Sequence, residues 1–317
     1  GMKGTVGPVL LVLAAILAFW YVACVPMNAR EVLTQAERGG AVLIPPSARE
    51  RIDAPLLPLL WQNSAHLDQS WSQLRPRLPS PHQVMVEIWD STVTEEVFSH
   101  RGIVQTGEWS KRSLIYHTGV TLSATVLGFL IGAALGVALA VGIVHNRAMD
   151  LSVMPWAIVS QTIPIVAIAP MVIVVLNSVG VQGLLPKAAI SAYLSFFPVV
   201  VGMVKGLRTP DAMQMDQMRT WNAPGTAVLW KLRLPSSMPY LFASLKIAIA
   251  AALVGTIVGE LPVQRGGLGA RMLAGSYYGQ TAQIWAALFA AALLAATLVW
   301  VIAMLERRML RRMGAAG

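Results

Sequence analysis

The chain is poor in charge. Only 12% of its 317 residues are Asp, Glu, Lys or Arg and 56% are hydrophobic, whereas a soluble domain usually carries about 25% charged residues. Apolar runs of roughly 18 or more residues are typical of membrane-spanning helices. Lipid leaves helices or closed barrels as the only spanning structures, and these runs lack strand-like alternation, so the sequence predicts an all-α polytopic membrane protein. The windows without a charged residue are 4–29, 113–146, 151–186, 188–204 and 272–305.

Other absences narrow the function. A single cysteine, Cys24, excludes an internal disulfide. The chain has no Gly-x-x-x-x-Gly-Lys-Ser/Thr phosphate loop, so we expect it to bind neither ATP nor Mg²⁺ and to catalyse no reaction by itself. His117 and His145 lack companions at metal-ligand spacing, so no metal site is expected.

Six spanning helices are predicted, at about 8–25, 114–144, 151–176, 186–205, 237–259 and 282–304. A cleaved signal peptide is the alternative for the first one. Its Phe19-Trp20-Tyr21 triplet is typical of an interfacial anchor, which favours a retained helix. We therefore expect four parts: an N-terminal helix (1–25), an extracytoplasmic segment (26–112) with a surface helix at 82–98, a core of five spanning helices (113–305) and a basic tail (306–317).

Lysine and arginine predict the orientation. With both termini in the cytoplasm, the short inner segments hold twelve basic residues and the short outer ones three, Lys187, Arg265 and Arg271. This asymmetry favours cytoplasmic termini. It also explains the net charge of +9 without nucleic acid as a partner. The inner residues are Lys3, Arg147, Lys205, Arg208, Arg219, Lys231, Arg233, Lys246, Arg307, Arg308, Arg311 and Arg312.

Small and polar residues inside the apolar runs are the next candidates. Glycines four residues apart let two helices approach closely in lipid, so Gly128, Gly132 and Gly136 predict a tight seam. The third helix contains Pro155, Pro164 and Pro170, and bends of this kind often lie beside a substrate path. Four polar residues are candidates for that path, with helix ends or local pairing as the alternative. They are Gln161, Thr162, Asn177 and Glu260, of which Glu260 could instead be a solvated helix end or a partner of Arg265.

One polar island interrupts the apolar C-terminal half: "MDQMRTWNAPGTAVLWKLRLP", residues 215–235. Thr209 and Pro210 predict the start of a short cytoplasmic helix. The Asn222–Gly225 turn would end this helix after Trp221, and a second short helix would lead to Pro235. Such an element suits docking into a groove on another protein. An amphipathic helix lying on the inner leaflet is the alternative.

The island resembles the cytoplasmic signature of ABC importer membrane subunits, which reads Glu-Ala-Ala, three residues, Gly, nine residues, Ile-x-Leu-Pro. Asp216 takes the Glu place, Asn222 takes the Gly place, and Leu232, Leu234 and Pro235 match the ending. Gln217 and Met218 stand in the Ala places. The stretches "SQTIPIVAIAPMVIVV", "FFPVVVGMVKGLR", "LPSSMPYLFASLKIAIAAALVGTIVGEL" and "GGLGARM" are similar to the nitrate/sulfonate/taurine branch, so the resemblance covers about 79–305.

The resemblance implies a type I importer permease in the bacterial inner membrane, with a coupling helix at about 208–235. Its partners would be cytoplasmic ATPase subunits, which bind ATP and Mg²⁺, an extracytoplasmic solute-binding protein, a second permease copy and membrane lipid. The cargo would be a sulfonate- or nitrate-like anion or a pyrimidine-like heterocycle. A self-sufficient secondary transporter or channel is the alternative, although such proteins usually carry mid-membrane charges and internal repeats.

Overall fold

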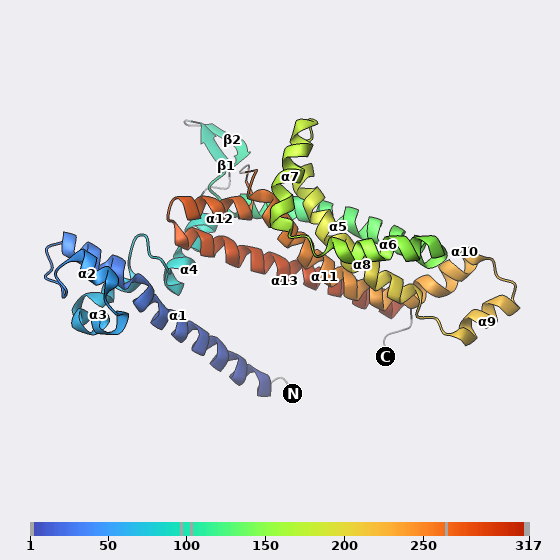
Figure 1. The fold of residues 1–317 in the computed structure, drawn as a ribbon, viewed down its shortest axis with the longest axis horizontal. Helices are drawn as coiled ribbons and strands as arrows, with labels where there is room; N and C mark the ends of the chain where they lie inside the picture. Colours follow the sequence, from blue (N-terminus) through green and yellow to red (C-terminus); the bar gives the residue numbers. More distant parts are fainter. Residues whose placement is uncertain (1–2, 96–97, 102–103, 264–265, 314–317) are drawn as a thin grey trace. The chain divides into compact units, whose positions relative to one another are not determined.

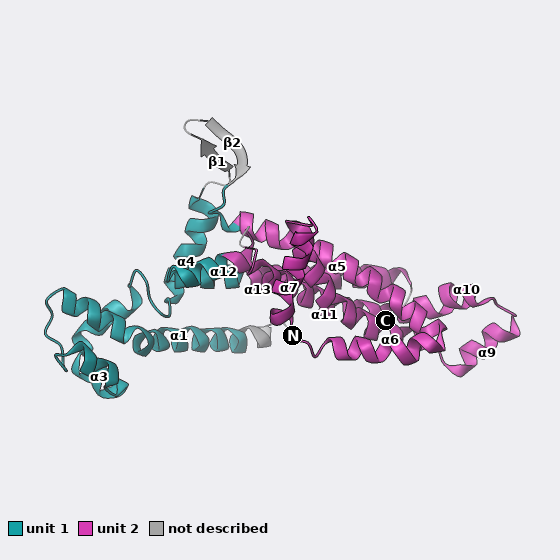
Figure 2. Cartoon of the chain, turned by 45° about the horizontal axis from the view of Figure 1, so that its top comes forward, with its two compact units in different colours: residues 1–114, 271–289 teal, residues 115–270, 290–317 magenta. Residues whose placement is uncertain are grey.

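The computed structural model describes residues 3–95, 98–101, 104–263 and 266–313. It is predominantly helical, as the sequence predicts (Figure 1). Among the described residues, five helices are long and apolar enough to cross a membrane, or six if one bent pair forms a single span. The chain divides into two compact units: residues 1–114 with 271–289, and residues 115–270 with 290–317 (Figure 2).

Helix α1 (Lys3–Arg38) is much longer than the predicted span at 8–25. A helix of 36 residues is about 54 Å long, whereas a bilayer core is about 30 Å thick. Pro8 and Pro26 lie inside it without ending it. Only part of α1 is therefore needed to cross a membrane, and the rest supports the segment that follows.

The segment after α1 folds back onto that helix. It contains α2 (Ala48–Asp53), α3 (Leu56–Gln62) and a 3₁₀-helix, η1 (Ser64–Trp71). The amide of Asn28 donates to the carbonyls of Ser70 and Leu78, at 2.9 and 2.8 Å. Leu33 packs with Leu43 and Leu59 in a small core. Residues 26–78 thus form an ordered subdomain built on the end of α1.

Residues 81–109 differ from the helix predicted at 82–98. Helix α4 (Pro81–Trp89) begins with a capping box between Ser80 and Gln83 and continues as a π-helix, η2 (Asp90–Thr94). Strands β1 (Phe98–Arg101) and β2 (Val104–Trp109) then form an antiparallel hairpin. The helix is shorter than predicted because the backbone becomes extended at Glu95, where φ is −72° and ψ is 130°.

The second unit is built around α5 (Leu114–His145), α8 (Leu184–Leu207), α11 (Leu234–Glu260) and the later part of α13 (Thr281–Arg312). Phe129, Val199, Ile249 and Ile302 meet in one buried cluster, so all four helices share a core. This unit also contains α6 (Arg147–Ser160), α7 (Ile165–Ser178), α9 (Ala212–Thr220), α10 (Gly225–Val228), a π-helix, η3 (Leu229–Arg233), and the first three residues of α12 (Leu268–Tyr277).

Small residues set the distance between α5 and α8. A Cβ atom at Gly128 would lie 2.4 Å from Cβ of Ser191, and one at Gly132 would lie 2.1 Å from Oγ of Ser195. At Gly136 it would lie 2.8 Å from the carbonyl oxygen of Phe196. The glycine stripe therefore faces α8 at a separation that a larger residue would not permit.

A second small-residue seam joins α8 to α11. A Cβ atom at Gly202 would lie 2.5 Å from Cβ of Ser244, and one at Gly206 would lie 2.8 Å from Cβ of Ser237. This seam was not predicted, although the four-residue spacing of Gly202 and Gly206 is the same sequence signal as in α5.

Candidate functional site

The polar island at 215–235 forms most of the helices α9 and α10, which lie beyond the ends of α8 and α11 (Figure 1). No residue of α9, α10 or η3 is buried. The apolar side chains of Met213, Trp221 and Trp230 are 80%, 66% and 69% exposed. Large exposed apolar side chains on a rigid element are typical of a surface that another protein or a lipid covers.

The start of α9 differs from the prediction. The predicted cap, Thr209, donates its hydroxyl to the carbonyl of Lys205 at 3.1 Å instead. The helix begins at Ala212, because Asp211 accepts from the backbone N–H of Gln214 at 2.7 Å and the Gln214 side chain accepts in return from the Asp211 N–H. This reciprocal pair satisfies two free donors at once, which a threonine cap alone does not.

The end of α9 explains the departure from the family signature at Asn222. Its φ of 49° is the one positive value at a non-glycine position in the described chain. The Asn222 N–H donates to the carbonyl of Arg219 at 2.8 Å, and the Ala223 N–H donates to that of Met218 at 3.0 Å. These two bonds form a Schellman motif, which needs a left-handed residue at this place. Asparagine tolerates that conformation, so it serves where the signature has glycine.

Gly225 lies outside the turn that the sequence predicts at Asn222–Gly225. It is the first residue of α10, its φ is not positive, and a Cβ atom there would meet nothing within 4 Å. Backbone freedom at the corner is therefore required at Asn222 and not at Gly225.

The remaining residues of the signature divide between the surface and the bundle. Asp216 pairs with Arg219 at 3.0 Å, and Gln217 is also exposed. Leu234 packs beside the buried cluster of Val200, Met203 and Leu207. Met218 and Leu232 are half-buried, and Pro235 lies in the first turn of α11. The π-helix η3 leads directly into α11, so the island is joined to a spanning helix without an intervening loop.

Two pathway candidates lie where the third predicted span breaks. The sequence predicts one bent helix at 151–176, but the structure has α6 and α7, which differ in direction by 103°. Gln161 and Thr162 are exposed in the break, and the Thr162 hydroxyl donates to the carbonyl of Val159 at 2.8 Å. The break is held to α8, since the Tyr193 hydroxyl donates to the carbonyl of Ser160 at 2.6 Å.

Asn177 lies at the other end of α7, about 20 Å from the break at 1.5 Å per residue. It lines a cavity of roughly 250 Å³ with Gln182, Pro186 and Pro262. The structure thus brings Asn177 next to the end of α11 and does not bring it to Gln161 and Thr162.

Glu260 is fully buried, so it is not a solvated helix end. Its carboxylate accepts from the Thr121 hydroxyl and from the Gly269 N–H, both at 2.8 Å. The Thr121 hydroxyl also accepts from the Leu268 N–H at 2.8 Å, and Lys187 donates to the carbonyl of Gly266 at 2.9 Å. Glu260 therefore holds the start of α12 against α5. Its alternative partner, Arg265, lies outside the described residues.

Lys187 and Thr121 were not identified as site residues from the sequence. Lys187 was assigned to an outer loop, but it lies buried in the first turn of α8. The sequence shows only a polar residue in the charge-free run at 113–146 and a single lysine between the runs at 151–186 and 188–204, and neither indicates its partner.

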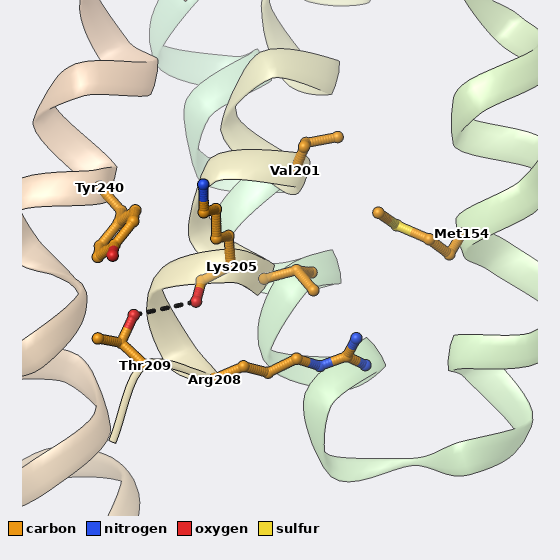
Figure 3. A pocket seen from close by; sticks show the side chains of 7 residues that line it. Met154, Val201, Lys205, Arg208, Thr209 and Tyr240 are labelled. Atoms are coloured by element: carbon orange, nitrogen blue, oxygen red, sulfur yellow. Dashed lines mark hydrogen bonds between the residues drawn. The ribbon is translucent and has the colours of Figure 1, made fainter. Parts of the chain in front are cut away.

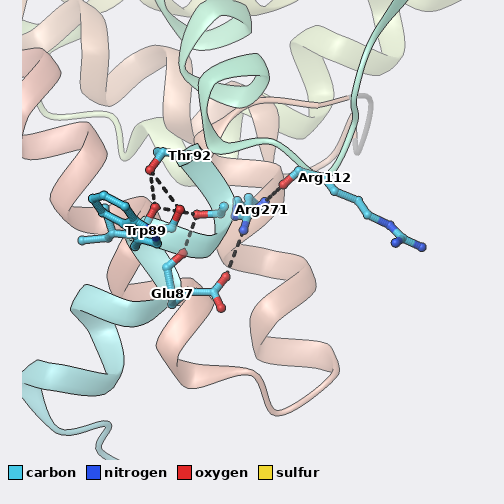
Figure 4. A network of polar contacts seen from close by, with 7 residues as sticks. Glu87, Trp89, Thr92, Arg112 and Arg271 are labelled. Atoms are coloured by element: carbon cyan, nitrogen blue, oxygen red, sulfur yellow. Dashed lines mark hydrogen bonds and ion pairs between the residues drawn. The ribbon is translucent and has the colours of Figure 1, made fainter. Parts of the chain in front are cut away.

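Within the first unit, the buried side chain of Arg271 is the centre of a second polar cluster (Figure 4). Its guanidinium donates to the carboxylate of Glu87 at 3.0 Å and to the carbonyl of Arg112 at 2.6 Å. Burial lowers the pKa of the Arg271 guanidinium, and the negative charge of Glu87 counteracts this shift. Arg271 was predicted in an outer loop, but it fastens α4 to α12.

Comparison with known proteins agrees with this arrangement. Residues 120–314 match the family described as the binding-protein-dependent transport system inner membrane component. A probable ABC transporter permease protein of Haemophilus influenzae is 29% identical over 64% of this chain and 76% of that relative. A riboflavin transport system permease protein of Chloroflexus aurantiacus is 28% identical over 74% of this chain and 89% of its own length.

A third relative, a putative aliphatic sulfonates transport permease protein of Bacillus subtilis, is 24% identical over 68% of this chain and 75% of its own length. The family match covers more than half of the chain, and it includes the island, the broken span and Glu260. The chain therefore belongs to the binding-protein-dependent transport system inner membrane components and is a multi-pass permease of the ABC importer class.

Proposed function

We propose that this permease moves a small polar solute inward across the bacterial inner membrane, driven by ATP hydrolysis in a partner subunit that docks on residues 212–235. The observation that carries this proposal is the construction of α9. Both of its ends are fixed, by the Asp211–Gln214 capping box and by the Schellman motif at Asn222, and none of its residues is buried. A rigid, uncovered helix joined to a spanning helix suits the transmission of force from one protein to another.

The proposed topology has both termini in the cytoplasm and residues 26–112 outside. The basic residues of the short segments support it. In this topology α9 meets the ATPase, and the subdomain of residues 26–78, the hairpin and the first unit's polar cluster face the side from which a solute-binding protein delivers its cargo. In the same topology, residues 113–305 form the core of five spanning helices, and residues 306–317 form a basic tail in the cytoplasm.

The proposed solute path passes the break between α6 and α7. Backbone at membrane depth that is not helical is tolerated where it lines a cavity or is covered by protein, and broken spans mark many transport sites. Gln161 and Thr162 supply polar side chains there, and Asn177 supplies one at the far end of α7. We assign Glu260 to the support of α12 against α5 and not to the path itself, because its carboxylate already accepts from two donors.

The proposed cargo is a sulfonate- or nitrate-like anion or a pyrimidine-like heterocycle. Relatives carry names that refer to formylaminopyrimidine, aliphatic sulfonates, nitrate and riboflavin. This variety among relatives of one fold supports a small polar solute as the cargo. We propose that the binding protein determines which chemical class of solute is transported.

Co-purification and reconstitution test this function. The tagged permease should retain an ATPase subunit in a complex with two copies of this fold, because one ATPase dimer offers two docking grooves. Solute uptake into vesicles should require that subunit and ATP. Uptake by the permease alone would instead support the secondary transporter or channel.

A further inference from the structure

The second unit has a pocket that none of the proposed path residues lines. It lies between α6, α8 and α11, near the end of α8 that leads to α9, and has a volume of roughly 600 Å³ (Figure 3). Met154 of α6, Val201 and Val204 of α8 and Tyr240 of α11 form its apolar and aromatic walls. Lys205, Arg208 and Thr209 complete the lining.

The polarity of this pocket changes along α8. Val201 and Val204 come first, Lys205 and Arg208 follow, and Thr209 lies just beyond the last helical residue, Leu207. At 1.5 Å per residue, these positions extend over about 12 Å. An apolar wall on the membrane side and cations on the side of the helix end match a ligand with an apolar tail and an anionic head.

The charges also favour an anion. Arg208 pairs with Asp150 at 2.8 Å, and both side chains are partly exposed. The pair leaves several guanidinium N–H groups available, since arginine has five donors. Lys205 is exposed with its ammonium 5.8 Å from the centroid of the Tyr240 ring. No carboxylate within the described part of the chain forms an ion pair with Lys205. The pocket therefore keeps one uncompensated positive charge.

We propose that this pocket binds the phosphate headgroup of an anionic phospholipid. Lys205 and Arg208 contact the phosphate, and an acyl chain lies along Met154 and Val201. Basic pockets between spanning helices on the cytoplasmic side are suited to anionic headgroups. The assignment to the inner leaflet rests on the proposed topology, whereas the binding itself does not. A free anion, such as a departing solute, would use the same cations but would leave the apolar wall without a ligand.

Native mass spectrometry of the full-length chain, titrated in detergent with phosphatidylglycerol or phosphatidylcholine, tests this proposal. The permease should prefer phosphatidylglycerol. Each cation near a headgroup phosphate is worth about a fivefold change in affinity. Lys205→Gln should therefore weaken phosphatidylglycerol binding about fivefold, and Lys205→Gln with Arg208→Gln about 25-fold. Phosphatidylcholine binding should change little.

Matched variants distinguish phosphatidylglycerol binding in the pocket from a general effect of positive charge on the protein surface. Arg311→Gln with Arg312→Gln removes the same charge from the end of α13 and should change the affinity less than twofold. Val201→Trp fills the apolar wall without a change of charge and should also weaken phosphatidylglycerol binding. Lys205→Arg keeps the charge and should retain the affinity, and unchanged phosphatidylcholine binding in Lys205→Gln would show that this variant is still folded.

Two results would overturn the proposal. One is an equal loss of phosphatidylglycerol affinity in the Lys205→Gln/Arg208→Gln variant and in the Arg311→Gln/Arg312→Gln variant. The other is displacement of phosphatidylglycerol by millimolar glycerol phosphate together with normal binding in Val201→Trp, which would assign the pocket to a free anion. Because no ATPase is present in this experiment, its outcome is independent of the proposed coupling function.

Discussion

The hydroxyl of Thr121 donates to the carboxylate of Glu260 at 2.8 Å, across 139 positions of sequence. The same hydroxyl accepts from the Leu268 N–H, so one side chain joins α5, the end of α11 and the start of α12. All of these groups are buried. A buried polar cluster is costly when one member is lost, because the partner is then left without a hydrogen bond.

Gly267→Ala should destabilise this cluster. Gly267 has a φ of 113°, and a Cβ atom there would lie 2.1 Å from Cδ of Glu260. Strained backbone of this kind costs about 1–3 kcal/mol, and the overlap adds to it. The matched control is Gly180→Ala, where φ is 85° but a Cβ atom meets nothing within 4 Å. Thermal unfolding of the purified permease should show a clearly larger loss for Gly267→Ala. Equal losses would mean that the contact with Glu260 is unimportant.

Gly132→Ala should loosen the seam between α5 and α8. The new methyl group would lie 2.1 Å from Oγ of Ser195 and 2.7 Å from the carbonyl oxygen of Ala192, so the helices must separate. Overpacking of this kind typically costs about 1–3 kcal/mol. Gly7→Ala in α1, where a Cβ atom meets nothing within 4 Å, is the control and should unfold at the wild-type temperature or above it. An unchanged midpoint in Gly132→Ala would contradict the tight seam.

Cysteine labelling tests the proposed topology. In a Cys24→Ser background, a membrane-impermeant maleimide should label Leu74→Cys in intact spheroplasts, because this position is 98% exposed in the segment predicted outside. Gln217→Cys, exposed on α9, should react only after the membrane is opened. A cysteine at the nearby position Ser70 would not report on the topology, because this position is fully buried. The reverse order of labelling would require the opposite orientation.

Asn222→Val should disturb the corner after α9. A β-branched residue is poorly suited to a φ of 49°, and left-handed backbone costs L-residues about 1–2 kcal/mol. Asn222→Gly should retain transport, since glycine adopts this conformation readily. Gly225→Ala should also be tolerated, because the site has ordinary φ and open space. Uptake by the reconstituted complex would rank these variants, and full uptake in Asn222→Val would refute the role of the left-handed corner.

The apolar runs predicted the spanning helices because a spanning helix must avoid charge over a fixed length. The absence of charge does not reveal the break between α6 and α7, because the whole run at 151–186 is uncharged. Pro164 indicates a bend, but its angle depends on contacts such as that of Tyr193 with Ser160, which lie far apart in sequence. The end of α1 was also placed too early, because residues 26–38 are polar and their helix is held by the subdomain that packs on it.

The signature residues of the island were predicted from spacing, whereas their local geometry was not. Asp211 and Thr209 are both suitable caps in sequence, and only the reciprocal bond with Gln214 decides between them. The buried roles of Lys187, Thr121 and Arg271 could not be predicted, because their partners come from helices whose packing is not encoded in any one segment.

The most direct test of the coupling function is the amount of ATPase subunit retained on the tagged permease, measured beside solute-stimulated ATP hydrolysis in the reconstituted complex. Asp216 is exposed and its pairing with Arg219 is a surface ion pair of little value for stability, so Asp216→Lys should fold normally. Loss of one docking anchor costs on the order of 2 kcal/mol, or about a 30-fold loss of affinity. We expect Asp216→Lys to lose both retention and stimulation and Asp216→Glu to keep both. Wild-type retention and stimulation in Asp216→Lys would refute docking of the ATPase on α9.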